Sequence, residues 1–170
     1  MSERHLHQDM TEAERRLSNV VMLGQVAELD ASRARVRVQA RVRVRARVRV
    51  QAGPIITAWL PFATVRAGPD RTWHAPEPGE QVVLVAPGGD LNQAVVVGSL
   101  YRDVYPPPAD SADISRTEWQ DGAALAYDRQ LHHWRLSVPG GGKIVLEVGP
   151  SKIEMSDSGI HLTAPRIDLN

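Results

Sequence analysis

The last third of the chain alternates apolar and polar residues in very short runs. Clusters of Gly, Pro, Ser and Asp, for example at 140–142 and 149–151, separate these runs. A period of two predicts half-buried strands, and the clusters predict the turns between them. Each strand offers only two or three apolar side chains to one side, which is too few to form a core within one chain. The apolar residues of these strands are Trp134, Leu136, Val138, Ile144, Leu146, Val148, Ile153, Met155, Ile160, Leu162, Ile167 and Leu169.

Strands of this kind become stable when several copies of a chain wind around one another and bury a shared axial stripe. We therefore expect residues 119–170 to form an intertwined triple-stranded β-helix in a homotrimer, with the twelve apolar residues named above as its core. Trp119 and Trp134 lie where this rod begins. We expect their large side chains to fill the axis there.

The first two thirds of the chain predict a short helix followed by a five-stranded OB-fold barrel. A helix from about Thr11 to Val20 would begin at an N-cap threonine and be ended by Gly24. Five short strands with one long loop between the third and the fourth suit a small Greek-key barrel. The predicted strands lie at about 25–29, 33–52, 57–62, 81–86 and 93–101. The predicted domain boundaries give an N-terminal arm at 1–23, the OB domain at 24–105 and a linker that begins with prolines at 106–118.

Residues 34–51 are three hexads in tandem, ARVRVQ, ARVRVR and ARVRVQ. In a strand, the valines would face one way and the arginines the other. The cationic stripe would either bind phosphates or an acidic protein, or form a solvated strand face lengthened by internal duplication. We favour the solvated face, because nucleic-acid platforms usually interleave aromatic residues and this strand has none. A single-stranded nucleic-acid-binding OB protein stays the alternative function, although it leaves the C-terminal strands without a purpose.

Charge, cysteine content and the length of apolar runs exclude several classes of function. The 170 residues include 20 basic and 20 acidic side chains, so no global charge draws the chain to nucleic acid or to an anionic membrane. The absence of cysteine excludes disulfides and thiolate chemistry. No apolar run approaches the ~18 residues of a membrane span. The N-terminus lacks the hydrophobic stretch of a secretory signal, so we expect synthesis and folding in a cytoplasm.

The residues that could act as catalysts or metal ligands do not form a recognisable motif. Six histidines are present without the spacing of a zinc site. The sequence has no Gly-x-Ser-x-Gly motif, no Cys/His arrangement and no phosphate-binding glycine loop. We therefore expect no enzyme activity, no cofactor and no metal. Trp59 and Trp73 are expected to pack the barrel with Phe62 and to pin its long loop; the alternative is that they are surface anchors for a partner.

Several stretches together resemble the baseplate assembly protein V family. They are TAWLPF at 57–62, RAGPDRTW at 66–73, PGEQV at 78–82, PGGDL at 87–91 and GSLY at 98–101. The family comprises the central spikes of contractile phage tails and R-type pyocins, which are related to the VgrG spikes of type VI secretion. The resemblance is close over about residues 17–108 and extends to the tail at the level of pattern.

The resemblance implies an OB domain that trimerises under the tail tube, followed by a β-helical needle. Sheath contraction would drive the tube, and the needle would transmit that force and pierce the outer membrane of the target cell. The implied partners are two further copies, the tail tube and baseplate hub proteins, within a virion or tailocin particle; no nucleic acid is expected. The outer OB surface would supply the tube and baseplate contacts, for which the candidates are Trp73, Arg41, Arg43, Arg45 and Arg47.

The chain also departs from the family pattern. Many simple spikes end in a His-x-His motif that binds iron at the apex, whereas this sequence ends in RIDLN at 166–170. An apical iron is therefore not expected: either a separate PAAR-like protein caps the needle, or the apex lies outside this sequence. Some relatives carry a muramidase between barrel and needle. Only a short linker occupies that place here, so peptidoglycan hydrolysis is not expected. The arginine hexads look expanded relative to the family.

Overall fold

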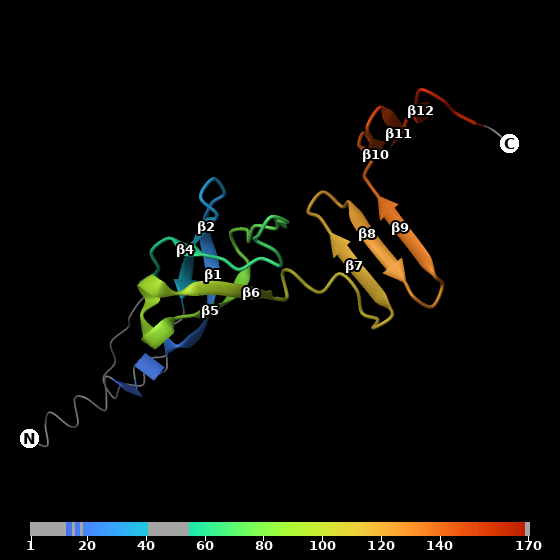
Figure 1. Cartoon of the computed structure of the whole chain (residues 1–170). Coiled ribbons are helices and arrows are strands. Elements are labelled where there is room, and N and C mark those ends of the chain that lie inside the picture. Colours follow the sequence, from blue (N-terminus) through green and yellow to red (C-terminus); the bar gives the residue numbers. More distant parts are fainter. Residues whose placement is uncertain (1–12, 15, 18, 41–54, 169–170) are drawn as a thin grey trace, which may run out of the picture. The chain divides into compact units, whose positions relative to one another are not determined.

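The structure is a computed structural model that describes residues 13–14, 16–17, 19–40 and 55–168. Within these described ranges the fold is all-β apart from one helical segment and two short 3-10 turns. It divides into two compact units, Met1–Pro106 and Pro107–Asn170 (Figure 1). The division falls in the proline cluster at 106–108. Each unit is described separately below.

The first unit has the architecture of an OB-like barrel. Its antiparallel sheet has the strand order β3-β2-β1-β5-β6, and β4 pairs with β2 (Figure 1). A parallel bridge from Phe62 to Val96 joins the chain after β4 to β6, and this contact closes the barrel. The strands are β1 (Val21–Asp30), β2 (Arg35–Ala40), β3 (Ile55–Ile56), β4 (Leu60–Pro61), β5 (Gln81–Val85) and β6 (Val95–Leu100), with the 3-10 turns η1 (Pro87–Gly89) and η2 (Leu91–Gln93) between β5 and β6.

Alternating residues of these strands build one hydrophobic core. In β2, Val36, Val38 and Ala40 are fully buried, whereas Arg35 and Arg37 lie on the outer side. The predicted alternation of the arginine repeat is therefore confirmed for residues 35–40. The rest of the repeat, with Arg41, Arg43, Arg45 and Arg47, lies outside the described residues. The other core residues are Met22, Val26, Leu60, Val82, Leu84, Ala86, Ala94 and Val96.

The prediction that Gly24 ends the N-terminal helix is wrong. Described residues up to 19 are helical, but β1 begins at Val21 and runs through Gly24, so the expected boundary between 23 and 24 cuts this strand. Gly24 is needed for packing. A Cβ built on it would lie 2.4 Å from Val38 Cγ1 and 3.0 Å from the Gln39 carbonyl oxygen. The glycine therefore permits the close approach of β1 and β2.

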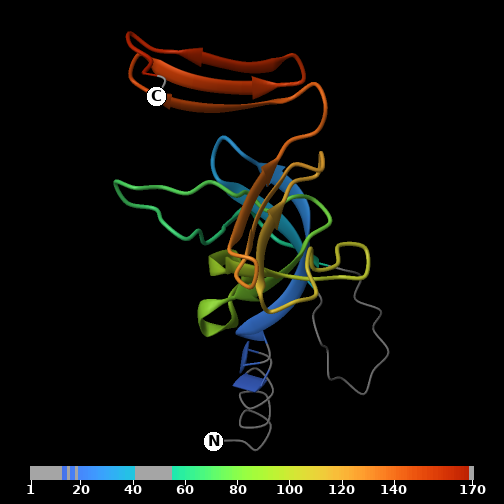
Figure 2. The same cartoon turned by 90° about the vertical axis from the view of Figure 1, so that its right-hand side faces the viewer.

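The second unit consists of two three-stranded antiparallel sheets, each a simple meander. The first contains β7 (Ile114–Glu118), β8 (Ala124–Asp128) and β9 (His133–Ser137); the second contains β10 (Lys143–Val148), β11 (Ser151–Ser156) and β12 (Gly159–Thr163) (Figure 2). The prediction of a linker at 106–118 is wrong in its second half, because β7 occupies it. The strand β8 was not predicted. The strand expected at 167–169 is absent at 167 and 168, which follow Pro165.

This second unit has almost no interior. Among its described residues only Ala124 is buried, whereas every member of the hydrophobic core cluster belongs to the barrel. Backbone pairing thus organises residues 107–168 without a hydrophobic core of their own. A unit that buries so little apolar surface gains little stability from the hydrophobic effect by itself.

Candidate functional site

The sheet formed by β10, β11 and β12 carries its apolar side chains, except Val145, on one face. Residues that pair directly across antiparallel strands point to the same side of a sheet. Leu146 pairs with Ile153, and Ile153 pairs with Leu162, so these three side chains form one row. All three are exposed, by 57%, 40% and 52%. The neighbouring rows are Ile144, Met155 and Ile160 on one side, and Val148 and Ser151 on the other.

The opposite face of the same sheet is charged. Glu154 lies between two ammonium groups, 2.7 Å from Lys152 Nζ and 3.4 Å from Lys143 Nζ. The hydrogen bond from Lys152, with the charge of Lys143, lowers the pKa of Glu154 below its ordinary value. The hydrogen bond to Glu154 in turn raises the pKa of Lys152. One face is therefore suited to water, and the other is suited to an apolar partner.

The sheet formed by β7, β8 and β9 is amphipathic in the same way. Trp134 pairs with Tyr127, and their rings lie 5.1 Å apart between centroids; the next row pairs Leu136 with Leu125. Trp134 and Leu136 are exposed by 65% and 47%. Sequence reasoning missed Leu125 and Tyr127, although their alternation at 125 and 127 was a usable signal. The opposite face carries Arg116, Glu118, Asp128, His133 and Arg135.

The structure thus brings nine of the twelve predicted core residues onto two apolar faces. Val138 directly follows β9 and is 37% exposed. Ile167 lies outside the strands and is 49% exposed. Leu169 lies outside the described residues. Trp119, expected at the start of the rod, is 43% exposed and donates its amide to the Ala123 carbonyl in the turn after β7.

On the outside of the barrel, the described part of the arginine stripe is matched by acids on β1. Arg37 Nη1 donates to Glu28 Oε1 at 3.0 Å, and Arg35 lies opposite Asp30 in the β1–β2 register. Trp59 lies against Arg37, with its ring centroid 5.6 Å from the guanidinium carbon. The prediction that Trp59 packs inside the barrel is wrong: it is 42% exposed and forms a cation–π pair on the surface. This charge pairing favours the solvated face over a polyanion site.

The long loop after β4 is tied to itself and to the barrel. Thr64 and Thr72 bring their hydroxyl oxygens within 2.7 Å, and the Arg66 amide donates to Thr72 Oγ1 at 3.2 Å. Trp73 packs on Phe62 with ring centroids 5.9 Å apart, as expected for the residue that pins this loop. Its side chain is still 56% exposed. Trp73 therefore remains accessible to a partner.

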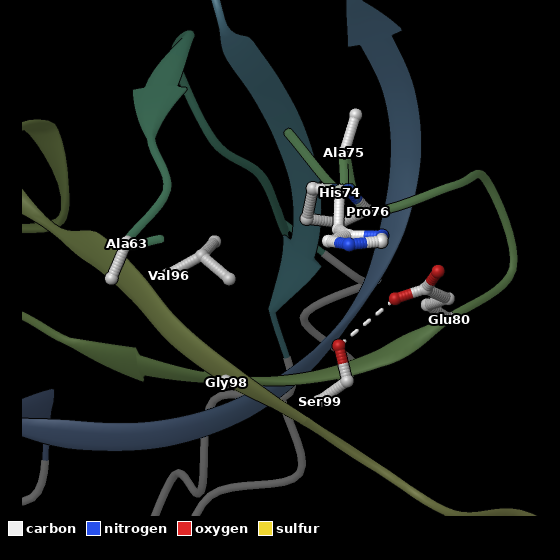
Figure 3. A pocket seen from close by; sticks show the side chains of 8 residues that line it. All are labelled: Ala63, His74, Ala75, Pro76, Glu80, Val96, Gly98 and Ser99. Atoms are coloured by element: carbon white, nitrogen blue, oxygen red, sulfur yellow. Dashed lines mark hydrogen bonds between the residues drawn. The ribbon is translucent and has the colours of Figure 1, made fainter. Parts of the chain in front are cut away.

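A hollow of about 200 Å³ lies between this loop, Glu80 just before β5, and the strand β6 (Figure 3). Its polar side chains include His74, Glu80 and Ser99. Ser99 Oγ donates to Glu80 Oε2 at 2.9 Å, while Glu80 Oε1 accepts from the Glu77 amide at 3.0 Å. Glu80 thus connects the end of the loop to β6. Its two carboxylate oxygens hold neighbouring parts of the chain together.

The chain leaves the barrel through a pinned turn. Arg102 and Tyr105 exchange backbone hydrogen bonds of 3.1 and 2.9 Å. Arg102 Nη1 donates to the Gly79 carbonyl at 2.7 Å, and Gln25 Nε2 donates to the same oxygen at 3.2 Å. Gly79 has a φ of 99°, and a Cβ there would lie 3.2 Å from the Tyr105 hydroxyl, so glycine suits this position. Only the residues from 106 to 113 then separate this turn from β7.

No three His, Cys, Asp or Glu side chains in the described ranges come together as a metal-ligand set. No helix within the described part of the chain is long and apolar enough to cross a membrane.

Comparison with known proteins identifies the barrel. Residues 22–101 match the family described as the type VI secretion system/phage-baseplate injector OB domain. The chain is also 37% identical, over 120 residues, to the spike protein of Escherichia phage P2. That match covers 71% of this chain and 51% of the phage protein, so the chain spans about half the length of this relative. Residues 22–101 therefore match the injector OB-domain family, and the resemblance to baseplate spike proteins that the motifs predicted is confirmed.

Proposed function

We propose that this chain is the structural central spike of a contractile injection system. Three copies wind their C-terminal units around one another into a triple-stranded β-helix, and the barrels form the base that caps the tail tube. When the sheath contracts, the spike transmits the force and pierces the envelope of the target cell. The role is mechanical, without a catalytic step, a cofactor or a bound metal.

One observation carries this proposal. The second unit presents two apolar sheet faces, yet among its described residues a single side chain, Ala124, is buried. Burial of a Leu, Ile or Val side chain contributes about 1.5–3 kcal/mol. Faces rich in such residues therefore supply a large driving force for assembly. The opposite faces carry the Lys143–Glu154–Lys152 network and other charges, as the outside of a rod in water requires.

The proposed partners follow from the family and from the accessible surface. The tail tube and baseplate hub proteins contact the outer OB surface, where Trp73 is exposed. A separate PAAR-like protein caps the needle. The assembled spike belongs to the baseplate of a phage or tailocin particle and meets the target outer membrane during injection.

Purified particles test this role. The strain that encodes the chain is made to produce its contractile particles, and the chain is quantified by mass spectrometry and located with antibody-bound gold. We expect three copies per particle at the baseplate end. Particles that contract and kill normally without the chain would contradict the proposal. Peptidoglycan zymography of the purified chain should show no lysis, and a clear lysis band would contradict the mechanical role.

A further inference from the structure

The hollow beside the long loop holds a negative charge that no cation of the described chain neutralises. Glu80 is half-buried there, and both hydrogen bonds to its carboxylate come from neutral donors, the Glu77 amide and the Ser99 hydroxyl. Glu80 makes no ion pair within the described ranges, and neither Lys nor Arg is among the residues that line the hollow. Because a carboxylate has about four lone-pair sites, about two of them remain open.

The other groups around this hollow also suit a hydrogen-bond donor. Ser99 gives its hydrogen to Glu80, so the lone pairs of the Ser99 oxygen can still accept. The imidazole of His74 lies at the same space (Figure 3). The walls consist of small or apolar residues, which are Ala63, Ala75, Pro76, Val96 and Gly98. A ligand that fits therefore has a positive head with several donors and an apolar stem.

We propose that this hollow receives an arginine side chain of the tail protein that covers the loop with Trp73. The proposal rests on the proposed function, which places tube and baseplate proteins on that loop, and it names the group that they contribute. A guanidinium has about five donors and no acceptor, and its plane matches both oxygens of a carboxylate such as Glu80. Its methylene stem packs along apolar walls. The hollow of about 200 Å³ is more than ten times the ~10–15 Å³ that one water needs.

A side chain tethered to a protein fits this hollow better than a free metal ion does. Calcium takes about 6–8 oxygen ligands, whereas Glu80 is the only carboxylate among the described residues that line the hollow. An exposed aromatic residue lies next to the hollow along the chain, because Trp73 precedes His74 and is 56% exposed. Trp and Arg are the residues that most often dominate the binding energy of interfaces. Trp73 and the partner's arginine thus form one anchoring contact.

Methyl NMR spectra of the full chain test the hollow, because Ala63, Ala75 and Val96 line it. The probe is Nα-acetyl-arginine amide, and its control is Nα-acetyl-citrulline amide, which has the same shape without the charge. We expect saturable shifts of these methyl signals with the arginine probe, lost in Glu80→Gln and kept in Glu77→Gln. No saturable shift, an equal response to citrulline, or a response to calcium chloride alone would overturn the site.

Glu77→Gln is the matched variant for Glu80→Gln. It removes the same charge from the same loop, and the Glu77 side chain is exposed and makes no hydrogen bond or ion pair among the described residues. Loss of one member of a desolvated charge pair weakens binding by tenfold or more. In strains that carry each variant in place of the native chain, we expect about tenfold fewer spike-bearing particles with Glu80→Gln than with Glu77→Gln.

A photo-crosslinking residue in place of Ala75 identifies the partner in irradiated particles. We expect an adduct with a tail protein that has an arginine beside the crosslink. Replacing that arginine with Glu should lower the particle yield, and combining it with Glu80→Arg should restore the yield. An adduct only with a second copy of this chain, a charge swap that does not restore the yield, or equal yields for Glu80→Gln and Glu77→Gln would overturn this inference alone. Particles that never contain the native chain would remove the proposed function as well.

Discussion

Leu146 of β10 lies directly opposite Ile153 of β11, and both side chains are largely exposed in the single chain. The next residue on β10, Val145, points to the other face and pairs with Glu154. Two adjacent positions of one strand thus belong to surfaces of opposite character. This alternation allows the assembly of the second unit to be tested separately from its folding.

The first prediction uses this pair of positions. Leu146→Lys places a charge on the apolar face, where assembly would bury it without a partner at a cost of several kcal/mol. Val145→Lys places the same charge beside Glu154 on the solvated face. Sedimentation velocity should show that Leu146→Lys no longer forms the three-chain species, whereas Val145→Lys does. Equal masses for the two variants would contradict the assignment of the faces.

The second prediction concerns the contact between β1 and β2. Gly24→Ala should destabilise the barrel by about 1–3 kcal/mol, because the new methyl group would collide with Val38. Calorimetry of the full chain should show that the melting temperature of the barrel falls by about 4–8 °C for each kcal/mol of destabilisation. Gly68→Ala is the control, since nothing lies within 4 Å of a Cβ built there. If Gly24→Ala were as stable as Gly68→Ala, β1 and β2 would not approach each other as closely as the structure shows.

The third prediction concerns acid. The pKa of Glu154 is lowered in the folded chain, first by the hydrogen bond from Lys152 and then by the charge of Lys143. A lowered pKa means that the carboxylate stabilises the fold fully above its ordinary value of 4.5 and loses this effect as the pH falls through the lowered pKa. The melting temperature should therefore fall below about pH 4.5, and Glu154→Gln should weaken this dependence.

Glu147→Gln is the matched control for the acid experiment. Glu147 lies on the same face, opposite Lys152, but makes no ion pair within the described residues. Its replacement should leave the acid dependence of the melting temperature nearly unchanged. A control that flattens the profile as much as Glu154→Gln would show that overall charge, rather than the contacts of Glu154, sets the response.

The fourth prediction concerns the exit from the barrel. Arg102→Ala removes a charged hydrogen bond to the Gly79 carbonyl, an interaction that contributes about 1.5–3 kcal/mol. Hydrogen exchange should become roughly 10- to 100-fold faster at the Tyr105 amide, which closes this turn. The amides of the barrel strands should change little. Arg71→Ala serves as the control, because the Arg71 side chain makes no hydrogen bond among the described residues. Unchanged exchange at Tyr105 would mean that Arg102 does not hold the turn.

Much of the fold followed from local patterns. Strands β10 to β12 were predictable because apolar residues alternate between Gly- and Ser-rich turns, and short turns also fix the register. Strand β7 was missed because Ser115, Arg116 and Thr117 offer no apolar alternation. In β8 the small residues Ala124 and Ala126 weaken the same signal. Gly24 was wrongly predicted to end the helix. A glycine that follows a helical pattern indicates the end of a helix as readily as it indicates a position within a strand.

Contacts between distant parts of the chain could not be read from local pattern. Arg37 meets Glu28 because the β1–β2 register shifts between Val26 and Glu28, which places the two side chains together. Trp59 lies on the surface because Arg37 provides a cationic partner there.

The most direct test of the account is the mass of the full chain measured by sedimentation equilibrium over a dilution series. We expect a single species of about 56 kDa, three times the 18.7 kDa of one chain, that unfolds in its second unit when it dissociates. A monomer of 18.7 kDa in which residues 107–168 melt cooperatively would contradict it, and so would a stable dimer.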